Sequence, residues 1–356
     1  MENIEKNEII EIEYNRPKFW HRIIANFVDI FIFVLFFITF FFTARFIVQS
    51  TPSYKAMENR MYEMQLESGL YVKSSVDGRI TDIIYDVERF DMPYGTEFDG
   101  EPSDHSVDPP RYVGINGIVV HGINTFIEYM SNPEHASENV YNNLVKYYDE
   151  LRLNAKINDL HLYVQDGDLI IPNPDATDVA SNNKYFYSLI YKPAIEKYCI
   201  PCFQANVPEY ASMLRTDFNL LVFVEVTSGY TIAAVLTYYV PGLIFRRGRK
   251  TFGKALYRIG LVDDRLLSPT VKRFTVRFIM FFFMELVLSL FSFGLPFIIS
   301  FTMMAFSKNR QGFPDYILKL QEIDTSKNNI YINYTDAQLK NGVHGKAIDF
   351  EMIKPL

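Results

Sequence analysis

The sequence predicts an all-α transmembrane helical bundle of three or four membrane segments, with an inserted α+β extracytoplasmic domain. Three observations predict this fold class. Long apolar runs occur over residues 19–48, 218–245 and 278–306 of the 356-residue chain. Residues 50–218 carry 26 acidic and 13 basic side chains, whereas the remainder carries 16 acidic and 22 basic ones. An acidic middle with basic flanks indicates two compartments and argues against a nucleic-acid-binding protein, whose basic residues cluster on one polar domain.

The first predicted membrane segment covers residues 19–48 and follows a polar cytoplasmic tail over residues 1–18. No charged side chain occurs between Ile30 and Phe42. Counted from Ile23, the run exceeds the roughly 20 helical residues that cross a ~30 Å hydrocarbon core. It is also longer than the apolar part of a signal peptide, about 7–15 residues, so we expect it to be retained as a signal anchor.

The second predicted membrane segment covers residues 218–245, and a basic cytoplasmic loop over residues 246–272 follows it. Six basic residues lie directly after the apolar run: Arg246, Arg247, Arg249, Lys250, Lys254 and Arg258. Basic residues at the end of a membrane helix mark its cytoplasmic side. The second segment therefore runs inward, the first runs outward, and the N-terminus is predicted to be cytoplasmic.

The third apolar region lies within residues 273–308, and its length does not match that of a single membrane helix. As one helix, the apolar stretch 278–306 would be about 43 Å long, much longer than the hydrocarbon core. Gly294 and Pro296 interrupt it, and both residue types weaken a helix interior. We expect a short helical hairpin, and one long tilted helix is the alternative. Lys308 and Arg310 favour a cytoplasmic tail over residues 309–356.

Residues 49–217 are long enough for one folded domain and are predicted to be α+β. Asp166-Gly167 lies inside an apolar stretch at 160–171 and predicts a tight β-hairpin, because this dipeptide adopts the positive φ angles of a type I′ turn. Residues 138–153 carry apolar side chains at helical spacing. Met57, Met61 and Met64 have the spacing expected if the first membrane helix continues outward.

Three motifs resemble those of the RDD family of bacterial membrane proteins, named for an arginine and two aspartates. They are the segment from Phe19 to Asp29 with Arg22, the glycine- and threonine-bearing segment 248–263, and the basic run from Lys308 to Asp315. Each motif lies at a predicted helix boundary, in the expected order. The resemblance implies a membrane bundle, with transport of a small solute or ion proposed for the family.

The resemblance covers residues 16–48 and 218–324 and has two departures. Family members usually have a short loop where this chain has residues 50–217, so the resemblance implies nothing about that segment. The family also tends to continue with Gly-Thr after the second aspartate, and this chain has Tyr316 there.

Arg22, Asn26 and Asp29 lie at positions i, i+4 and i+7, so they share one helical face. A carboxylate within the hydrocarbon region needs a partner or water. We hypothesise that Arg22 bridges Asp29 and Asp315 in one polar cluster near the inner membrane face. Two alternatives stay open: the cluster conducts an ion or proton, or it only holds the helices together.

Two glutamates also lie in apolar runs. Glu285 is expected either to line a cation or proton path with Asp29 or to pair with Arg273 or Arg277. Glu225 lies near the outer end of the second segment and is expected to reach water.

The sequence provides little support for an enzyme. Cys199-Ile-Pro-Cys202 lacks the preceding strand of a redox motif, so we expect a local disulfide or an unused pair of thiols, with thiol redox chemistry as the low-probability exception. The histidines lack ligand spacing, and no calcium, phosphate-binding or nucleophile-elbow motif occurs. No metal and no cofactor are therefore predicted.

Two functions remain as hypotheses. The first is a multi-pass protein of the bacterial cell membrane that moves a small ion or solute past the polar cluster. The second is a non-transporting anchor that presents residues 49–217 to an extracytoplasmic ligand or partner. The expected partners are the lipid bilayer, an ion or small solute and a second copy of the chain in a homo-oligomer, but no nucleic acid.

Overall fold

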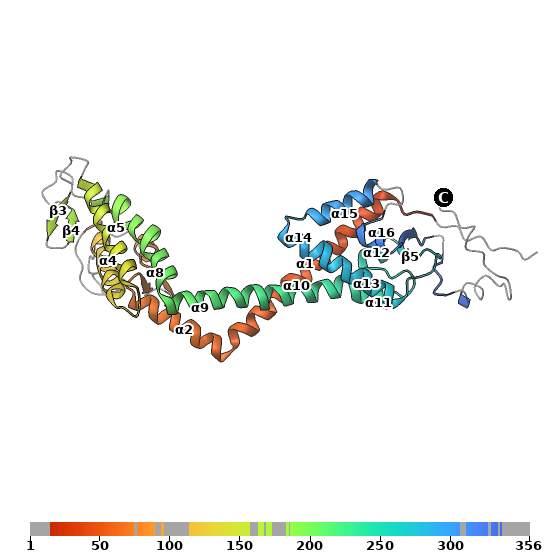
Figure 1. Cartoon of the computed structure of the whole chain (residues 1–356), viewed down its shortest axis with the longest axis horizontal. Helices are drawn as coiled ribbons and strands as arrows, with labels where there is room; N and C mark the ends of the chain where they lie inside the picture. The colour runs from red at the N-terminus through yellow and green to blue at the C-terminus, as the bar shows by residue number, and fades with distance from the viewer. Residues whose placement is uncertain are drawn as a thin grey trace, which may run out of the picture. The chain divides into compact units, whose positions relative to one another are not determined.

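The computed structural model (Figure 1) describes most of the chain and is mainly helical over that part. The described residues are 15–74, 77–89, 94–95, 114–156, 163–166, 169–172, 183–184, 186–306, 311–326, 329–333 and 335–336. Contacts divide the chain into two compact units. Unit 1 comprises residues 1–46 and 222–356, and unit 2 comprises residues 47–221.

Two helices are long and apolar enough to cross a membrane. The first is α1 (Phe19–Ser50). The second is a continuous helix over Pro208–Ile244. Its parts are α9 (Pro208–Asn219), η3 (Leu220–Val226), α10 (Thr227–Ala234), η4 (Val235–Tyr239) and α11 (Val240–Ile244), where η denotes a π-helical stretch. Together they supply the two long apolar helices that the sequence predicts.

The burial pattern of α1 is the reverse of that of a helix in a water-soluble protein. Its buried residues are Arg22, Ala25 and Asp29. Phe27 and Phe31, by contrast, are 66% and 65% exposed. Large apolar side chains on the outside and charged groups on the inside are expected when the surrounding solvent is lipid.

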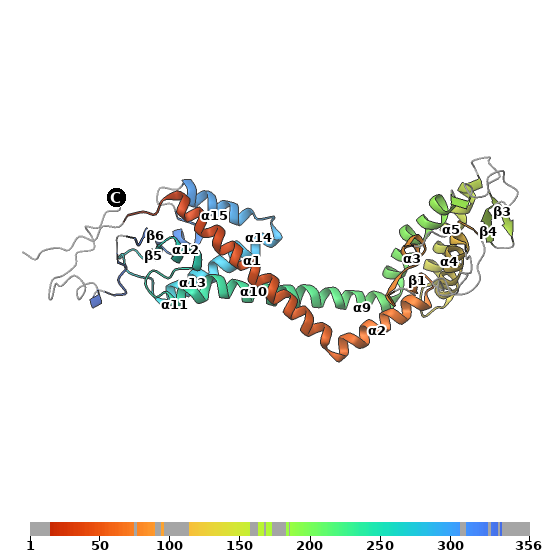
Figure 2. The ribbon, with the colours of Figure 1, turned by 180° about the vertical axis from the view of Figure 1, so that it is seen from behind.

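The third apolar region forms a helical hairpin (Figure 2). Its first arm consists of α13 (Val271–Met280), η5 (Phe281–Val287) and α14 (Leu288–Phe291), and its second arm is α15 (Leu295–Phe306). The chain reverses at Phe293 and Gly294, which have φ angles of 50° and 80°. The structure therefore has no single long helix here. The 12 residues of α15 extend only about 18 Å.

Short elements close one end of the unit 1 helices. They are α12 (Phe252–Leu256), β5 (Ile259–Val262), α16 (Phe313–Ile317) and β6 (Gln321–Asp324). Strands β5 and β6 pair antiparallel, with Ile259 opposite Asp324 and Val262 opposite Gln321. This pairing joins the loop after the second long helix to the segment after the hairpin. Lys308 and Arg310, which entered the topology prediction, lie outside the described residues.

Unit 2 has its own hydrophobic core, to which Phe126, Tyr191 and Phe203 contribute fully buried side chains. Its first elements are α2 (Pro52–Glu67), β1 (Tyr71–Lys73), β2 (Ile80–Asp82), α3 (Ile83–Arg89), α4 (Ile115–Ser131) and α5 (Glu138–Lys156). They are followed by β3 (Tyr163–Asp166), β4 (Leu169–Pro172), η1 (Tyr187–Tyr191), α7 (Lys192–Ala194), η2 (Ile195–Cys199) and α8 (Ile200–Asn206).

Two local predictions for unit 2 have different outcomes. Strands β3 and β4 pair with Asp166 opposite Leu169, as the Asp-Gly turn predicts. The predicted continuation of the first helix through Met57–Met64 is wrong, because α2 is a separate helix. The hydroxyl of Thr51 caps it by accepting from the backbone N–H of Tyr54, and Pro52 is its first residue. Proline at a first helical position lacks an N–H that would be unpaired there, so it favours a new start.

Candidate functional site

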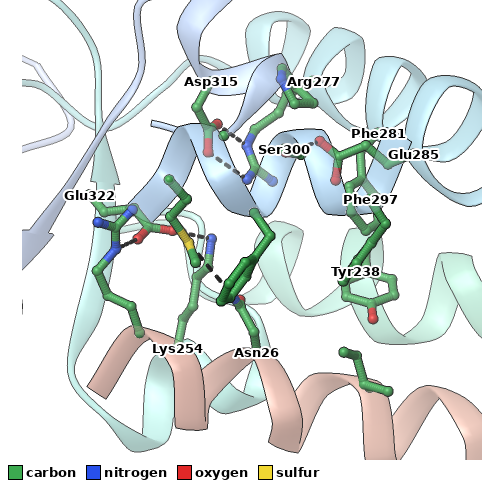
Figure 3. A pocket seen from close by; sticks show the side chains of 16 residues that line it. Asn26, Tyr238, Lys254, Arg277, Phe281, Glu285, Phe297, Ser300, Asp315 and Glu322 are labelled. Atoms are coloured by element: carbon green, nitrogen blue, oxygen red, sulfur yellow. Dashed lines mark hydrogen bonds and ion pairs between the residues drawn. The ribbon is translucent and has the colours of Figure 1, made fainter. Parts of the chain in front are cut away.

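A polar cavity of about 90 Å³ lies within unit 1 (Figure 3). A single water needs roughly 10–15 Å³ measured in this way, so the cavity has room for several waters or a small hydrated ion. Among its described lining residues, three are basic and three acidic: Arg22, Lys254, Arg277, Glu285, Asp315 and Glu322. Apolar side chains, including Ile30, Phe281 and Phe301, complete the wall.

Glu322 binds two of the basic residues at once. One of its carboxylate oxygens accepts from Nε of Arg22 on α1 at 2.5 Å, and the other lies 2.7 Å from Nζ of Lys254 on α12. The side chain of Glu322 is 10% exposed. Burial alone would raise the pKa of Glu322, but the charges of Lys254 and Arg22 lower that pKa well below its usual range. The three residues thus connect strand β6 to two helices.

Arg277 and Asp315 form the second ion pair of the cavity. Nε and Nη2 of Arg277 donate to the two carboxylate oxygens of Asp315 at 2.5 and 3.0 Å. Such two-bond pairs are strong and fix the relative orientation of their partners. The pair joins the first arm of the hairpin to α16, which follows its second arm.

Glu285 is held differently from the other two cavity carboxylates. Its Oε1 accepts a hydrogen bond of 2.6 Å from the hydroxyl of Ser300, so its partner lies on the opposite arm of the hairpin. No described basic side chain forms an ion pair with it, and the predicted pairing with Arg273 or Arg277 is wrong. Those two arginines instead bind Asp264 and Asp315.

Asp29 does not line the cavity but binds the start of α12. Its carboxylate accepts from the hydroxyl of Thr251 at 2.5 Å and from the backbone N–H of Gly253 at 2.7 Å. The contact is close, because a Cβ on Gly253 would lie 2.0 Å from the backbone oxygen of Ala25. Here only glycine fits, and the carboxylate of Asp29 completes the hydrogen bonding of this helix start.

The structure brings together four of the five residues proposed for the polar cluster. Arg22, Asn26, Glu285 and Asp315 all line the cavity, and the amide of Asn26 lies 3.7 Å from the sulfur of Met304. The predicted bridge from Arg22 to the two aspartates is wrong. Each aspartate has another partner. Asp29 accepts hydrogen bonds from Thr251 and Gly253, and Asp315 pairs with Arg277.

Glu322 was not predicted as a site residue from the sequence, and neither Lys254 nor Arg277 was assigned to the site. Lys254 and Arg277 lie in basic stretches. Because such stretches indicate membrane orientation, neither residue was expected to pair with Glu322 or Asp315. Glu322 lies in a polar stretch with no apolar context to single it out. Only the pairing of β6 with β5 brings it beside Arg22.

Glu225 does not reach water, contrary to its prediction. It is fully buried, and its Oε2 pairs with Nη1 of Arg45 at 3.0 Å. The physical reason is that Arg45, on the neighbouring helix α1, supplies a counter-charge within the apolar region. This pair is separate from the residues that line the cavity.

The two cysteines of unit 2, Cys199 and Cys202, are free thiols, so of the two alternatives, a local disulfide or an unused pair of thiols, the structure has the second. Both lie on the continuous helical stretch of η2 and α8, where Cys199 is in the core and Cys202 is partly exposed. Burial raises the pKa of the Cys199 thiol. A raised pKa disfavours the reactive thiolate. Across the described parts of the chain, no group of three or more His, Cys, Asp or Glu side chains is placed to hold a metal ion.

Comparison with known proteins finds one match. The model of the RDD family matches residues 212–319, which include Thr251, Lys254, Arg277, Glu285 and Asp315. The resemblance to the RDD family is therefore confirmed for the segment that holds the second and third sequence motifs, and the first motif, Phe19–Asp29, lies outside the match. No curated protein matches this chain, and no solved structure does so. The family match and the apolar helices together indicate a membrane protein.

Proposed function

Residues 212–319 belong to the RDD family of membrane-associated proteins, and from this premise we propose that the chain moves a small ion or solute across a membrane through the polar cavity of unit 1. The observation that carries the proposal is the cavity itself. It places six ionisable side chains inside a unit whose outer helical surface is apolar. Glu285 lies within the apolar first arm of the hairpin, and charged groups at membrane depth are costly and mark ion or substrate paths.

A purely structural role would need fewer charges. The Arg277–Asp315 pair and the Glu322 bridge already connect α1, α12, α13, α16 and β6. Glu285 has no ion-pair partner among the described residues, so it adds the cost of a buried carboxylate without the stabilisation that an ion pair returns. A carboxylate retained at that cost supports a role in handling an ion.

In the proposed topology, the chain crosses the bacterial cell membrane several times and its N-terminus is cytoplasmic. The start of α1, the end of α11, the start of α13 and α16 all lie at one end of unit 1 (Figure 1). The basic loop that includes Arg246 and Arg247 is at this same end, and basic loops face the cytoplasm. Two long helices and the hairpin give four helical segments. Residues 47–221 would then be extracytoplasmic, because the chain crosses the membrane once before them.

So few segments make a thin wall around a path, and we therefore propose a homo-oligomer in the bilayer. The proposed role is not enzymatic.

The test is ion flux through the full chain in lipid vesicles. Currents are recorded on a supported membrane after exchange between solutions that differ in NaCl, KCl or pH. Met304 lines the cavity, so Met304→Trp should fill it and lower the current at least tenfold. Ile299 lies on the same helix and is 55% exposed, so Ile299→Trp is the matched control and should stay within twofold of the unaltered protein. Size-exclusion profiles verify that both variants fold.

Either of two results overturns the transport proposal. One is a current from the unaltered protein no larger than that of empty vesicles. The other is an equal current from both tryptophan variants.

A second function is supported by unit 2. Residues 47–221 form a compact unit with a core of their own and make up about half of the chain. They would then bind an extracytoplasmic ligand or partner while unit 1 serves as the anchor. This function predicts no current in the vesicle experiment.

A further inference from the structure

We propose that Glu285 is a proton-binding site, and that the cavity of unit 1 takes up and releases a proton there. This inference rests on the proposed transport function and names the ion that the cavity handles. It is argued from the partners of Glu285, from the charges that face it and from the oxygen atoms available around it.

The first argument is the contrast among the three cavity carboxylates. Both oxygens of Asp315 bind Arg277, and both oxygens of Glu322 bind cations. A proton arriving at either group would have to displace a positive charge. Glu285 is 6% exposed and has no ion pair among the described residues, so its protonation breaks none.

The second argument is the hydrogen bonding of Glu285. The oxygen of Ser300 accepts from the backbone N–H of Phe313 at 3.0 Å, and its hydroxyl donates to Oε1 of Glu285 at 2.6 Å. While Glu285 is ionised, Ser300 is the donor of this bond, because a carboxylate can only accept. Oε2 is the oxygen that remains to take up the proton. Protonation transfers H⁺ from a hydronium ion to Oε2: one O–H bond of the hydronium breaks, one O–H bond forms on Glu285, a water molecule is left, and the carboxylate is neutralised.

The third argument concerns a metal cation, which the cavity suits poorly. Metal cations such as Na⁺ or Ca²⁺ need several oxygen ligands. Here the oxygens of Asp315 and Glu322 are already bound to basic side chains. The other side-chain oxygens of the described lining belong to Asn26, Tyr238, Glu285 and Ser300, and only that of Glu285 is acidic. Arg277 and Lys254 also line the cavity and repel a second cation. A proton needs only one oxygen.

The other charges that line the cavity with Glu285 come from five elements. Arg22 lies on α1, Lys254 on α12, Arg277 on α13, Asp315 on α16 and Glu322 on β6. The phenol of Tyr238 on η4 also lines the wall. With Glu285 ionised, the three acidic and three basic side chains balance. Uptake of one proton leaves one net positive charge, so the electrostatic state of the cavity changes with each proton bound.

The test measures protonation directly, by infrared difference spectra of the full-length protein in lipid between about pH 9 and pH 5, a range that covers buried glutamates. The carbonyl stretch of a protonated carboxylic acid should appear reversibly as the pH falls. Glu285→Gln should remove this component of the spectrum. Glu225→Gln, a substitution at another buried glutamate of unit 1, should keep it. Ser300→Ala removes a bond that stabilises the ionised form, so the midpoint of the band should move to higher pH.

Two outcomes overturn the inference: the unaltered protein shows no such band, or Glu285→Gln leaves the band unchanged. Because the readout is spectroscopic, it is independent of transport. A titrating band without any current contradicts the proposed function and keeps the proton site. A current without the band supports the proposed function and contradicts the proton site.

Discussion

Arg22 and Glu322 are 300 residues apart in the chain and form an ion pair of 2.5 Å in which both side chains are almost fully buried. The same carboxylate binds Lys254 at 2.7 Å. One glutamate on the short strand β6 thereby holds the first membrane helix to the loop that follows the second. Glu322 lies three residues beyond the segment that matches the RDD family.

Replacing Glu322 should destabilise unit 1 strongly. Glu322→Gln leaves Arg22 and Lys254 buried beside a neutral group, and breaking a buried pair in this way costs about 3–5 kcal/mol. Thermal unfolding in detergent at neutral pH measures the loss. Glu63→Gln, at a surface position with a side chain 63% exposed, serves as the control and should cost less than about 1 kcal/mol.

The effect of Glu322→Gln should also depend on pH. The basic partners lower the pKa of Glu322 in the folded protein below its unfolded value of about 4.3. Its stabilising contribution is therefore complete above about pH 5 and is lost as the pH falls below about 4 toward the folded pKa. The difference in unfolding temperature between Glu322→Gln and the unaltered protein should shrink over that interval. A difference that stays constant down to pH 3 would show that this ion pair does not stabilise the fold.

Exchanging the partners of the second ion pair should restore folding. Arg277→Asp or Asp315→Arg alone places two like charges together in a buried site, and each should abolish the folded peak in size exclusion. The double variant should recover much of it. The matching exchange of Arg22 with Asp29 should recover nothing, because these two residues have different partners. Recovery in that second exchange would contradict the pairings described here.

Gly253 should not tolerate a side chain. A Cβ there would lie 2.0 Å from the backbone oxygen of Ala25. Gly253→Ala must push α12 away from α1 and should cost about 1–3 kcal/mol or more. Leu256 lies on the same helix and is 67% exposed, so Leu256→Ala is the control and should change the unfolding temperature little.

The hydrogen bond from the Thr251 hydroxyl to Asp29 should contribute to the stability of the contact between α12 and α1. Asp29→Asn weakens two hydrogen bonds to a charged acceptor and should cost about 2–3 kcal/mol, whereas Thr251→Val removes one and should cost about 1–2 kcal/mol. The double variant should lose clearly less than the sum of the two, because they share one interaction. Strict additivity would mean that the two side chains do not interact.

The helices of this protein could be predicted from the sequence better than their partners. Apolar runs and basic clusters depend on local composition, so they identify α1, the second long helix and the interrupted hairpin. Thr51-Pro52 also indicates where α2 begins, but the methionine spacing that follows favoured a continuous helix. A local capping signal was stronger there than periodicity.

The pairings within the cavity depend on contacts that local sequence does not encode. Arg22 was expected to bind Asp29, which shares its helical face, and Asp315, which the nearby basic residues place at the cytoplasmic border. The structure instead gives it Glu322, which the register of β5 and β6 brings into position. Likewise Glu285 forms a hydrogen bond with Ser300 rather than an ion pair with an arginine. The hairpin turn at Phe293 and Gly294 determines which residues of the two arms face each other.

The central claim is that an ion passes through the cavity beside Glu285, and proton flux into vesicles tests it most directly. Vesicles that contain the full chain and an internal pH-sensitive dye are given an inward proton gradient. We predict that the unaltered protein acidifies the interior, that Glu285→Gln slows this at least tenfold, and that Glu225→Gln stays within twofold. Acidification by Glu285→Gln at the rate of the unaltered protein would contradict the account.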